Sequence, residues 1–170
     1  NDHRDLALLV SEFHSIIHIA LELRSTTLLK FFDRADAWRK PERLKQLLEC
    51  CRADFHGRLG FAEREYPEPD YVAEAFAAAQ AVPVQPIIAA GYQGEAIRQK
   101  LGRERQLAIR AVRERWLERQ QPLRASGQFG QERQGPVADI RLEQAELQLA
   151  DATRQLAGRL TGPGSTALRW

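Results

Sequence analysis

Apolar residues recur at steps of three and four positions along most of this 170-residue chain, a spacing that predicts amphipathic helices. In the first segment the apolar positions run from Leu6 to Ile17. Residues 95–119 carry the longest regular pattern, with apolar residues at Ile97, Leu101, Ala108, Val112 and Trp116. No stretch alternates apolar and polar residues for long enough to predict a strand. The sequence therefore predicts an all-α fold, a stack of helices without a sheet.

Capping residues and prolines predict where the helices begin and end. Ser25 is a candidate N-cap for a short helix that ends near Trp38, and Pro41 suits the first turn of the next helix. The apolar face of that next helix is formed by Leu44, Leu47, Leu48, Cys51 and Phe55. An alanine-rich helix is expected from about Asp70 to Ala81, where prolines end it.

The composition changes after residue 119. The stretch RQQPLRASGQFGQERQG is rich in Gln, Gly and Arg and offers little to bury, so residues 120–135 are predicted to be a linker. Apolar residues return at helical spacing between Leu142 and Leu160, and a Gly-Pro-Gly run follows them. We therefore predict that residues 136–170 form a C-terminal extension with one amphipathic helix, over residues 137–160.

Composition narrows the class of protein. The formal net charge is only +2, so overall charge does not by itself indicate a nucleic-acid partner. No apolar run approaches the length that crosses a bilayer, and no secretory signal is visible. Cys50 and Cys51 are adjacent, which suits neither a disulfide nor a zinc site, so we expect a reduced, cytoplasmic protein without a membrane partner. The chain has no Met and opens with Asn1 near a helical pattern, which we interpret as a fragment of a larger protein.

Basic residues gather in two places. The segment AWRKPERLKQ holds four of them, Arg39, Lys40, Arg43 and Lys45. Residues 95–119 hold eight basic residues against four acidic ones. At about 100° per residue, Arg103, Arg110 and Arg113 are predicted to lie opposite the apolar side of this helix. Such a stripe matches the phosphates of nucleic acid, but a charge-rich helix face is often simply solvated, so both interpretations stay open on charge alone.

Two pairs of side chains have a spacing that could hold a metal ion. His14 and His18 lie one helical turn apart, although the intervening SII contains no Glu base of the metalloprotease type. Asp33 and Asp36 are three residues apart in FFDRADAW and could also ligate a metal. The alternatives are histidines at the boundary of the core, and carboxylates paired with a neighbouring arginine. No Gly-rich phosphate loop, Walker motif or nucleophile triad is present in the sequence.

Five successive blocks of the chain are LVSEFHSIIH, LLKFFDRADAWRKPERLKQL, CCRADFHGRLGFAEREYP, AQAVP and IIAAGYQGEAIRQKLGRERQLAIRAV. In this order they resemble blocks of the bacterial CCA-adding tRNA nucleotidyltransferases that carry a His-Asp (HD) phosphohydrolase domain. The resemblance covers roughly residues 4–118, and its more specific parts are DAWRKP and the pattern Asp54–Gly57–Arg58–Gly60–Phe61.

This resemblance implies a tRNA-binding C-terminal portion of such an enzyme. Residues 1–38 would end the HD-like region, and residues 39–119 would form a helical body and tail that grip the acceptor and TΨC arms of tRNA. Intact members add CCA to tRNA 3′ ends from CTP and ATP, with Mg²⁺, and Ni²⁺ at the HD site, as cofactors. Because the nucleotidyltransferase head has no counterpart here, the chain alone is predicted to be inactive and to carry no cofactor. The expected tRNA contacts are Arg39, Lys40, Arg43, Lys45, Arg58, Arg98, Arg103, Arg110 and Arg113.

The resemblance also implies an incomplete metal half-site. His14 matches the family's later His and Asp33 its last Asp, but Ser15 stands where an Asp is expected. Two ligands hold a metal ion weakly. Two alternatives to tRNA binding therefore stay open: a remnant metal-dependent phosphohydrolase that uses His14 and Asp33, and a helical interaction module that works through residues 137–160.

Overall fold

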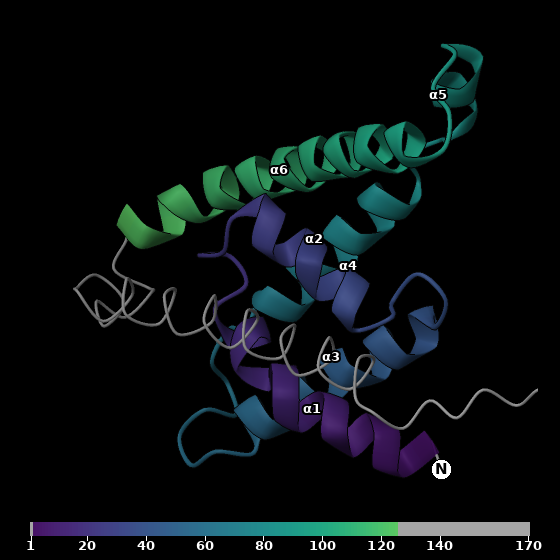
Figure 1. Ribbon diagram of the computed structural model, residues 1–170. Helices are drawn as coiled ribbons and strands as arrows, with labels where there is room; N and C mark the ends of the chain where they lie inside the picture. The colour runs from purple at the N-terminus through teal and green to yellow at the C-terminus, as the bar shows by residue number, and fades with distance from the viewer. Residues whose placement is uncertain (1, 126–170) are drawn as a thin grey trace, which may run out of the picture. The chain divides into compact units, whose positions relative to one another are not determined.

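A computed structural model describes residues 2–125 of the chain, and the side chains of residues 3–120. These residues form six helices, α1 (Asp2–His18), α2 (Ser25–Arg34), α3 (Pro41–His56), α4 (Glu68–Gln80), α5 (Gln85–Ala89) and α6 (Glu95–Ala125). The described residues contain no strand, which confirms the predicted all-α fold (Figure 1). The last helix extends beyond its predicted end, so it includes the start of the expected linker. The rest of that linker and the predicted helix at 137–160 lie outside the described residues.

The helices pack around α4. The long helix α6 lies against α2 and α4, and α1 packs on α3 and α4 (Figure 1). The short helix α5 contacts α6 and protrudes from one end of it. Helices α2 and α6 therefore lie on one side of α4, with α1 and α3 on the other.

Aromatic side chains join these layers in the core. The Phe32 ring lies 5.1 Å from the ring of Phe76 on α4, and the Phe13 ring lies 5.3 Å from that of Phe31. Trp38 extends the cluster, with its ring centroid 5.2 Å from that of Phe76. Edge-to-face and tilted contacts at these distances are the favourable arrangements of aromatic pairs. The cluster therefore ties α1, α2, α4 and the α2–α3 connection into one core.

The predicted apolar faces of α3 and α1 agree with the structure in different degrees. All five residues predicted for the α3 face are buried, namely Leu44, Leu47, Leu48, Cys51 and Phe55. In α1 the last turns are buried through Phe13, Ile16 and Ile17. The first turns of α1 are less covered, and Leu8 there keeps 58% of its surface exposed.

The second helix differs from its prediction at both ends. Ser25 is the first residue inside α2, and Arg24 occupies the N-cap position without a side-chain cap. The helix ends at Arg34 rather than near Trp38. The reason is Asp36, which adopts a left-handed backbone conformation with φ of 54°. Residues in that conformation commonly end helices, and Asp tolerates it better than most side chains.

The apolar content around α4 is higher than the sequence pattern suggested. By length and composition alone the 22-residue stretch Glu68–Ala89 could cross a membrane, because an 18-residue window within it has a mean hydropathy of 1.3. The expectation that no apolar run approaches this length was therefore wrong. This stretch is nevertheless two helices, because residues 81–84 between α4 and α5 are not helical. The buried side chains of α4 include Tyr71, Val72, Ala75 and Ala79, which makes α4 a core helix of the bundle.

Candidate nucleic-acid interface

We define the outer face of α6 by four side chains that follow one another along the side of the helix that points away from the bundle. They are Lys100, Arg103, Leu107 and Arg110. Leu107 is 57% exposed, and the Arg110 side chain is 67% exposed. Successive members lie three or four positions apart, so they follow one another along a single side of the helix. Lys100 was not among the predicted contacts, although its position three residues before Arg103 places it on the same face.

The cations of this outer face differ in their partners. Lys100 pairs with Glu104 at 2.7 Å, and Arg110 pairs with Glu114 at 2.9 Å, both one helical turn ahead. Arg103 is exposed and pairs with no carboxylate of the described residues. Ion pairs between neighbours on a helix surface are weak, because solvent screens them, so they do not hold the two cations against a stronger anion.

Arg113 does not belong to the outer face, which corrects the predicted stripe. Its Nε atom donates a hydrogen bond to the Leu21 carbonyl oxygen at 3.0 Å, and its side chain is half-buried. Ile109 and Val112, which precede it on the neighbouring part of the helix surface, are 0% and 1% exposed. The buried side of α6 is therefore centred closer to Ile109 than the sequence pattern indicated, and Arg113 lies at its margin.

Three further arginines of α6 serve packing within the bundle. Arg105 lies over the Trp38 ring, with its guanidinium carbon 4.0 Å from the ring centroid. On another side of the helix, Arg115 and Arg119 approach the Glu74 carboxylate at 3.2 and 3.6 Å. The same carboxylate accepts a hydrogen bond of 2.6 Å from the indole of Trp116. Glu74 is therefore the point at which α4 holds the C-terminal half of α6.

The basic segment before and within α3 has less free charge than its sequence suggested. Arg39 makes a bidentate ion pair with Asp36, which lowers the pKa of that carboxyl chiefly through the hydrogen bonds from Arg39. Arg43 reaches Asp5 on α1 at 3.6 Å and keeps only 19% of its side chain exposed. Lys45 lies 3.9 Å from Glu42 and is largely exposed, and Lys40 is exposed as well. The pair with Arg39 agrees with one of the two interpretations that the spacing of Asp36 left open.

The last two predicted contacts lie in other parts of the fold. Arg58 pairs with Asp54 at 2.5 Å on the C-terminal turn of α3. Arg98 pairs with Glu95 at 3.4 Å in the first turn of α6, and 83% of its side chain is exposed. The nine predicted contacts thus lie in separate parts of the fold. Among them, Arg103 and Arg110 share one side of a single helix, the outer face of α6.

The predicted metal half-site has separate partners for its two members. His14 hydrogen-bonds through Nδ1 to the Val10 carbonyl oxygen at 3.1 Å. Asp33 accepts a hydrogen bond of 2.6 Å from the indole of Trp38 and interacts electrostatically with Arg105. Among residues 2–125, no group of three or more His, Cys, Asp or Glu side chains could hold a metal ion. The described residues therefore do not fit the metal centre that the resemblance implies for intact members.

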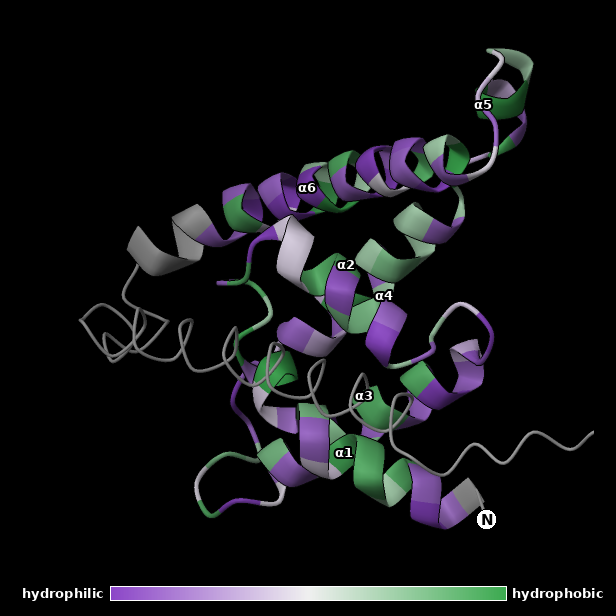
Figure 2. Ribbon diagram, in the orientation of Figure 1, coloured by the Kyte–Doolittle hydropathy of each residue, from purple (hydrophilic) through white to green (hydrophobic). Residues whose placement is uncertain are grey.

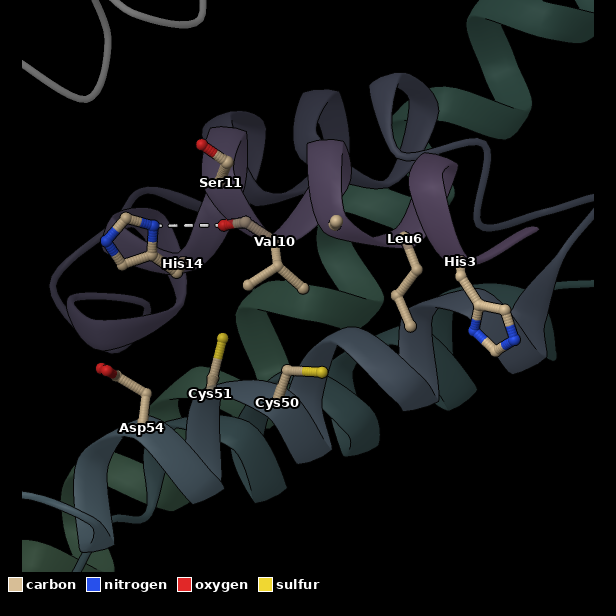
Figure 3. Close-up of a pocket in the computed structure, with 9 residues that line it drawn as sticks. His3, Leu6, Val10, Ser11, His14, Cys50, Cys51 and Asp54 are labelled. Atoms are coloured by element: carbon tan, nitrogen blue, oxygen red, sulfur yellow. Dashed lines mark hydrogen bonds between the residues drawn. The ribbon is translucent and has the colours of Figure 1, made fainter. Parts of the chain in front are cut away.

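A groove between α1 and α3 gathers several reactive side chains (Figure 3). Its lining residues are His3, Leu6, Ala7, Val10, Ser11, His14, Cys50, Cys51 and Asp54. Burial raises the pKa of the Cys51 thiol to about 12, and the charges of Cys50 and Asp54 act in the same direction. Because a thiolate is the reactive form, Cys51 is not an activated nucleophile at neutral pH.

His18 closes one end of the α1–α3 packing. Its Nδ1 atom shares a hydrogen bond of 2.6 Å with the Tyr66 hydroxyl, and its Nε2 atom lies 3.5 Å from the Asp54 carboxylate. Burial lowers the pKa of His18, and the Arg58 charge lowers it further, while Asp54 opposes both effects. His18 is thus a boundary histidine with structural partners, one of the two interpretations that its spacing left open.

These features define an all-helical domain with a basic outer face on α6 and no metal cluster among its described residues. The sequence is 67% identical over 116 residues to a multifunctional CCA protein from Tolumonas auensis, a match that covers 68% of this chain and 28% of that protein. For the multifunctional CCA proteins of Psychromonas ingrahamii and Shewanella frigidimarina the identities are 53% over 112 residues and 47% over 121 residues. Those matches cover 66% and 71% of this chain, and 27% and 29% of the two relatives.

The chain is therefore homologous to part of the bacterial multifunctional CCA proteins, and it spans about 28% of the length of the relatives it matches. No family model matches the sequence. No solved structure matches it either.

Proposed function

We propose that this chain is the tRNA-binding portion of a CCA-adding tRNA nucleotidyltransferase, and that the outer face of α6 contacts tRNA phosphates. In this proposal the whole enzyme adds C, C and A to tRNA 3′ ends from CTP and ATP in the cytoplasm. The nucleotidyltransferase head, which supplies the chemistry, is the protein partner of this chain. Residues 1–38 end the HD-like region, and residues 39–119 form the body and tail.

The observation that carries the proposal is the arrangement of charge on α6. Between residues 95 and 110 the sequence holds five basic and two acidic residues, and of the basic ones only Arg105 is directed into the bundle. Arg103 has no carboxylate partner in the described part of the chain. The carboxylate partners of Lys100 and Arg110 are Glu104 and Glu114, which lie one turn ahead on the same helix. A phosphate group offers a stronger, charge-assisted hydrogen bond than these weak pairs, so it can replace them.

The homology supports tRNA as the source of those phosphates, because the matching relatives are multifunctional CCA proteins. A helix presents cations about 5 Å apart at steps of three and four residues, which follows a phosphate backbone without reading bases. Recognition would therefore depend on the shape of the tRNA, and unrelated tRNAs should bind about equally.

Equilibrium binding of the chain to a tRNA transcript without its CCA end, measured by fluorescence anisotropy over a salt series, tests the proposal. Four contacts, by Arg98, Lys100, Arg103 and Arg110, should give a slope of log affinity against log salt of about −3. A chain that does not bind the transcript at low salt, or whose affinity is independent of salt, would show that the outer face of α6 is only solvated.

A further inference from the structure

The connection between α5 and α6 is a tightly constrained protruding tip. Ile87 anchors it, because this side chain is 6% exposed and its carbonyl oxygen accepts a hydrogen bond from the Tyr92 N–H at 3.4 Å. Gly91 and Gly94 flank the segment with φ of 89° and 52°, backbone conformations that L side chains rarely adopt. The Gly91 N–H also donates to the Ile88 carbonyl oxygen at 2.9 Å. Backbone hydrogen bonds donated by Gly91 and Tyr92 therefore constrain the turn of this tip.

This constrained backbone presents two apolar side chains to solvent. Ile88 is 47% exposed and Tyr92 is 39% exposed, in contrast to the buried neighbour Ile87. Figure 2 shows apolar residues on the α5 segment where it protrudes from the end of α6. A tyrosine ring held by a fixed backbone has few rotamers to lose, so it can bind a flat partner at small entropic cost.

The charge around the tip indicates the chemistry of that partner. Arg98, in the first turn of α6, has 83% of its side chain exposed. Lys100, in the second turn of α6, lies near Tyr92 and begins the outer face of this helix. An aromatic ring beside cations that continue along a helix is the combination with which proteins hold unpaired nucleotides. Two exposed apolar side chains are, in addition, far too few for the core of a stable protein–protein interface.

We propose that Tyr92 stacks on an exposed nucleobase of the bound tRNA, while Arg98 and Lys100 hold the phosphates beside that base. This inference rests on the proposed tRNA binding. The outer face of α6 contacts only phosphates in that proposal, and Tyr92 adds a contact to a base. Bases in the loops of tRNA are unpaired and can be offered to an aromatic ring, whereas those inside a duplex are stacked on one another. The tip should therefore distinguish a tRNA from a plain duplex.

The test compares the Tyr92→Ala and Tyr92→Phe chains with the unmodified chain. The probes are a tRNA transcript and a long, blunt-ended RNA duplex. Base–aromatic stacking accounts for roughly 1–3 kcal/mol, so Tyr92→Ala should weaken tRNA binding about 5- to 150-fold. Tyr92→Phe should bind within about two-fold of the unmodified chain, because the ring remains. Duplex binding and the salt slope should be the same for all three chains.

Leu59→Ala is the matched control, since Leu59 is 101% exposed and lies in the α3–α4 connection, far from α5 in Figure 1. It should leave tRNA binding unchanged. Equal tRNA binding by Tyr92→Ala and the unmodified chain would overturn the stacking contact, and so would an equal loss for tRNA and duplex. Neither outcome would contradict the proposed function. The proposed function fails only if the unmodified chain does not bind tRNA, or binds it without salt dependence.

Discussion

The Nε atom of Arg113 donates a hydrogen bond of 3.0 Å to the carbonyl oxygen of Leu21, a residue 92 positions earlier in the chain. This bond joins α6 to the turn that follows α1. Leu21 is 5% exposed, so no water replaces the guanidinium easily. Arg113 is therefore part of the framework of the bundle, and it differs in role from Arg103 and Arg110 on the same helix.

The Arg113→Gln variant should consequently lose stability. Removal of a charged donor leaves the Leu21 carbonyl oxygen buried without its partner, which costs about 1–3 kcal/mol. Urea denaturation followed by circular dichroism measures the change. The matched control is Arg110→Gln, an exposed position, which should leave the unfolding midpoint nearly unchanged. Equal midpoints for the two variants would show that the bond to Leu21 contributes nothing.

Arg105 also joins α6 to another part of the bundle, because its guanidinium carbon lies 4.0 Å from the ring centroid of Trp38. A partly desolvated cation–π contact contributes up to about 2 kcal/mol, so Arg105→Gln should lower the free energy of unfolding by a similar amount. Arg64 over Phe61, at 4.2 Å in an exposed connection, offers the control, and Arg64→Gln should have a much smaller effect. The interpretation fails if the two substitutions have the same effect in urea denaturation.

Helix faces could be predicted from the sequence where apolar residues are dense, and less well where arginines border them. The face of α3 was complete, because Leu44 to Phe55 leave a single buried side. On α6 the predicted face included Val112 but not Ile109, which is 0% exposed. Because Ile109 was omitted, the centre of the predicted buried side lay too far from Arg113. Arg113 was therefore expected to face solvent. The partner of Arg113 is a backbone carbonyl contributed by another part of the fold, which no spacing within α6 can indicate.

The candidate site was predicted only in part for a similar reason. Arg103 and Arg110 were expected on an exposed face, and both are exposed. The pairing of Arg43 with Asp5, by contrast, joins α3 to α1 and depends on how these two helices pack. The α5–α6 tip could not be predicted either, because the glycine conformations that present Tyr92 follow from the turn as a whole.

His18 makes stability depend on pH. Because burial lowers its pKa in the folded chain, the unfolded chain binds a proton more readily than the folded one. The stability due to His18 is therefore fully present above its unfolded pKa of about 6.5, and it is lost as the pH falls through the lower, folded value. Between about pH 7 and pH 5 the unfolding free energy of the unmodified chain should fall more steeply than that of His18→Gln. Parallel curves for the two chains in urea denaturation would refute this role.

The incomplete metal half-site stays a prediction, and it can be tested directly. We expect no strong binding of Ni²⁺ or Mg²⁺, because His14 and Asp33 have separate partners and two ligands hold an ion weakly. Isothermal titration calorimetry should show heats close to those of dilution for the unmodified chain and for His14→Ala. A stoichiometric site of micromolar affinity that disappears in His14→Ala would contradict the expectation and favour the remnant phosphohydrolase.

The central claim is that the outer face of α6 binds tRNA phosphates, and two double variants of equal charge test it most directly. Arg103→Gln with Arg110→Gln removes two cations from that face. Arg115→Gln with Arg119→Gln removes two from the side of the same helix that holds Glu74. The decisive measurement is tRNA affinity over a salt series for both variants, with circular dichroism to establish that each is folded. The first variant should lose about two units of the logarithmic salt slope, and the second should keep the slope of the unmodified chain. Identical curves for the two folded variants would contradict the assignment of this face to tRNA.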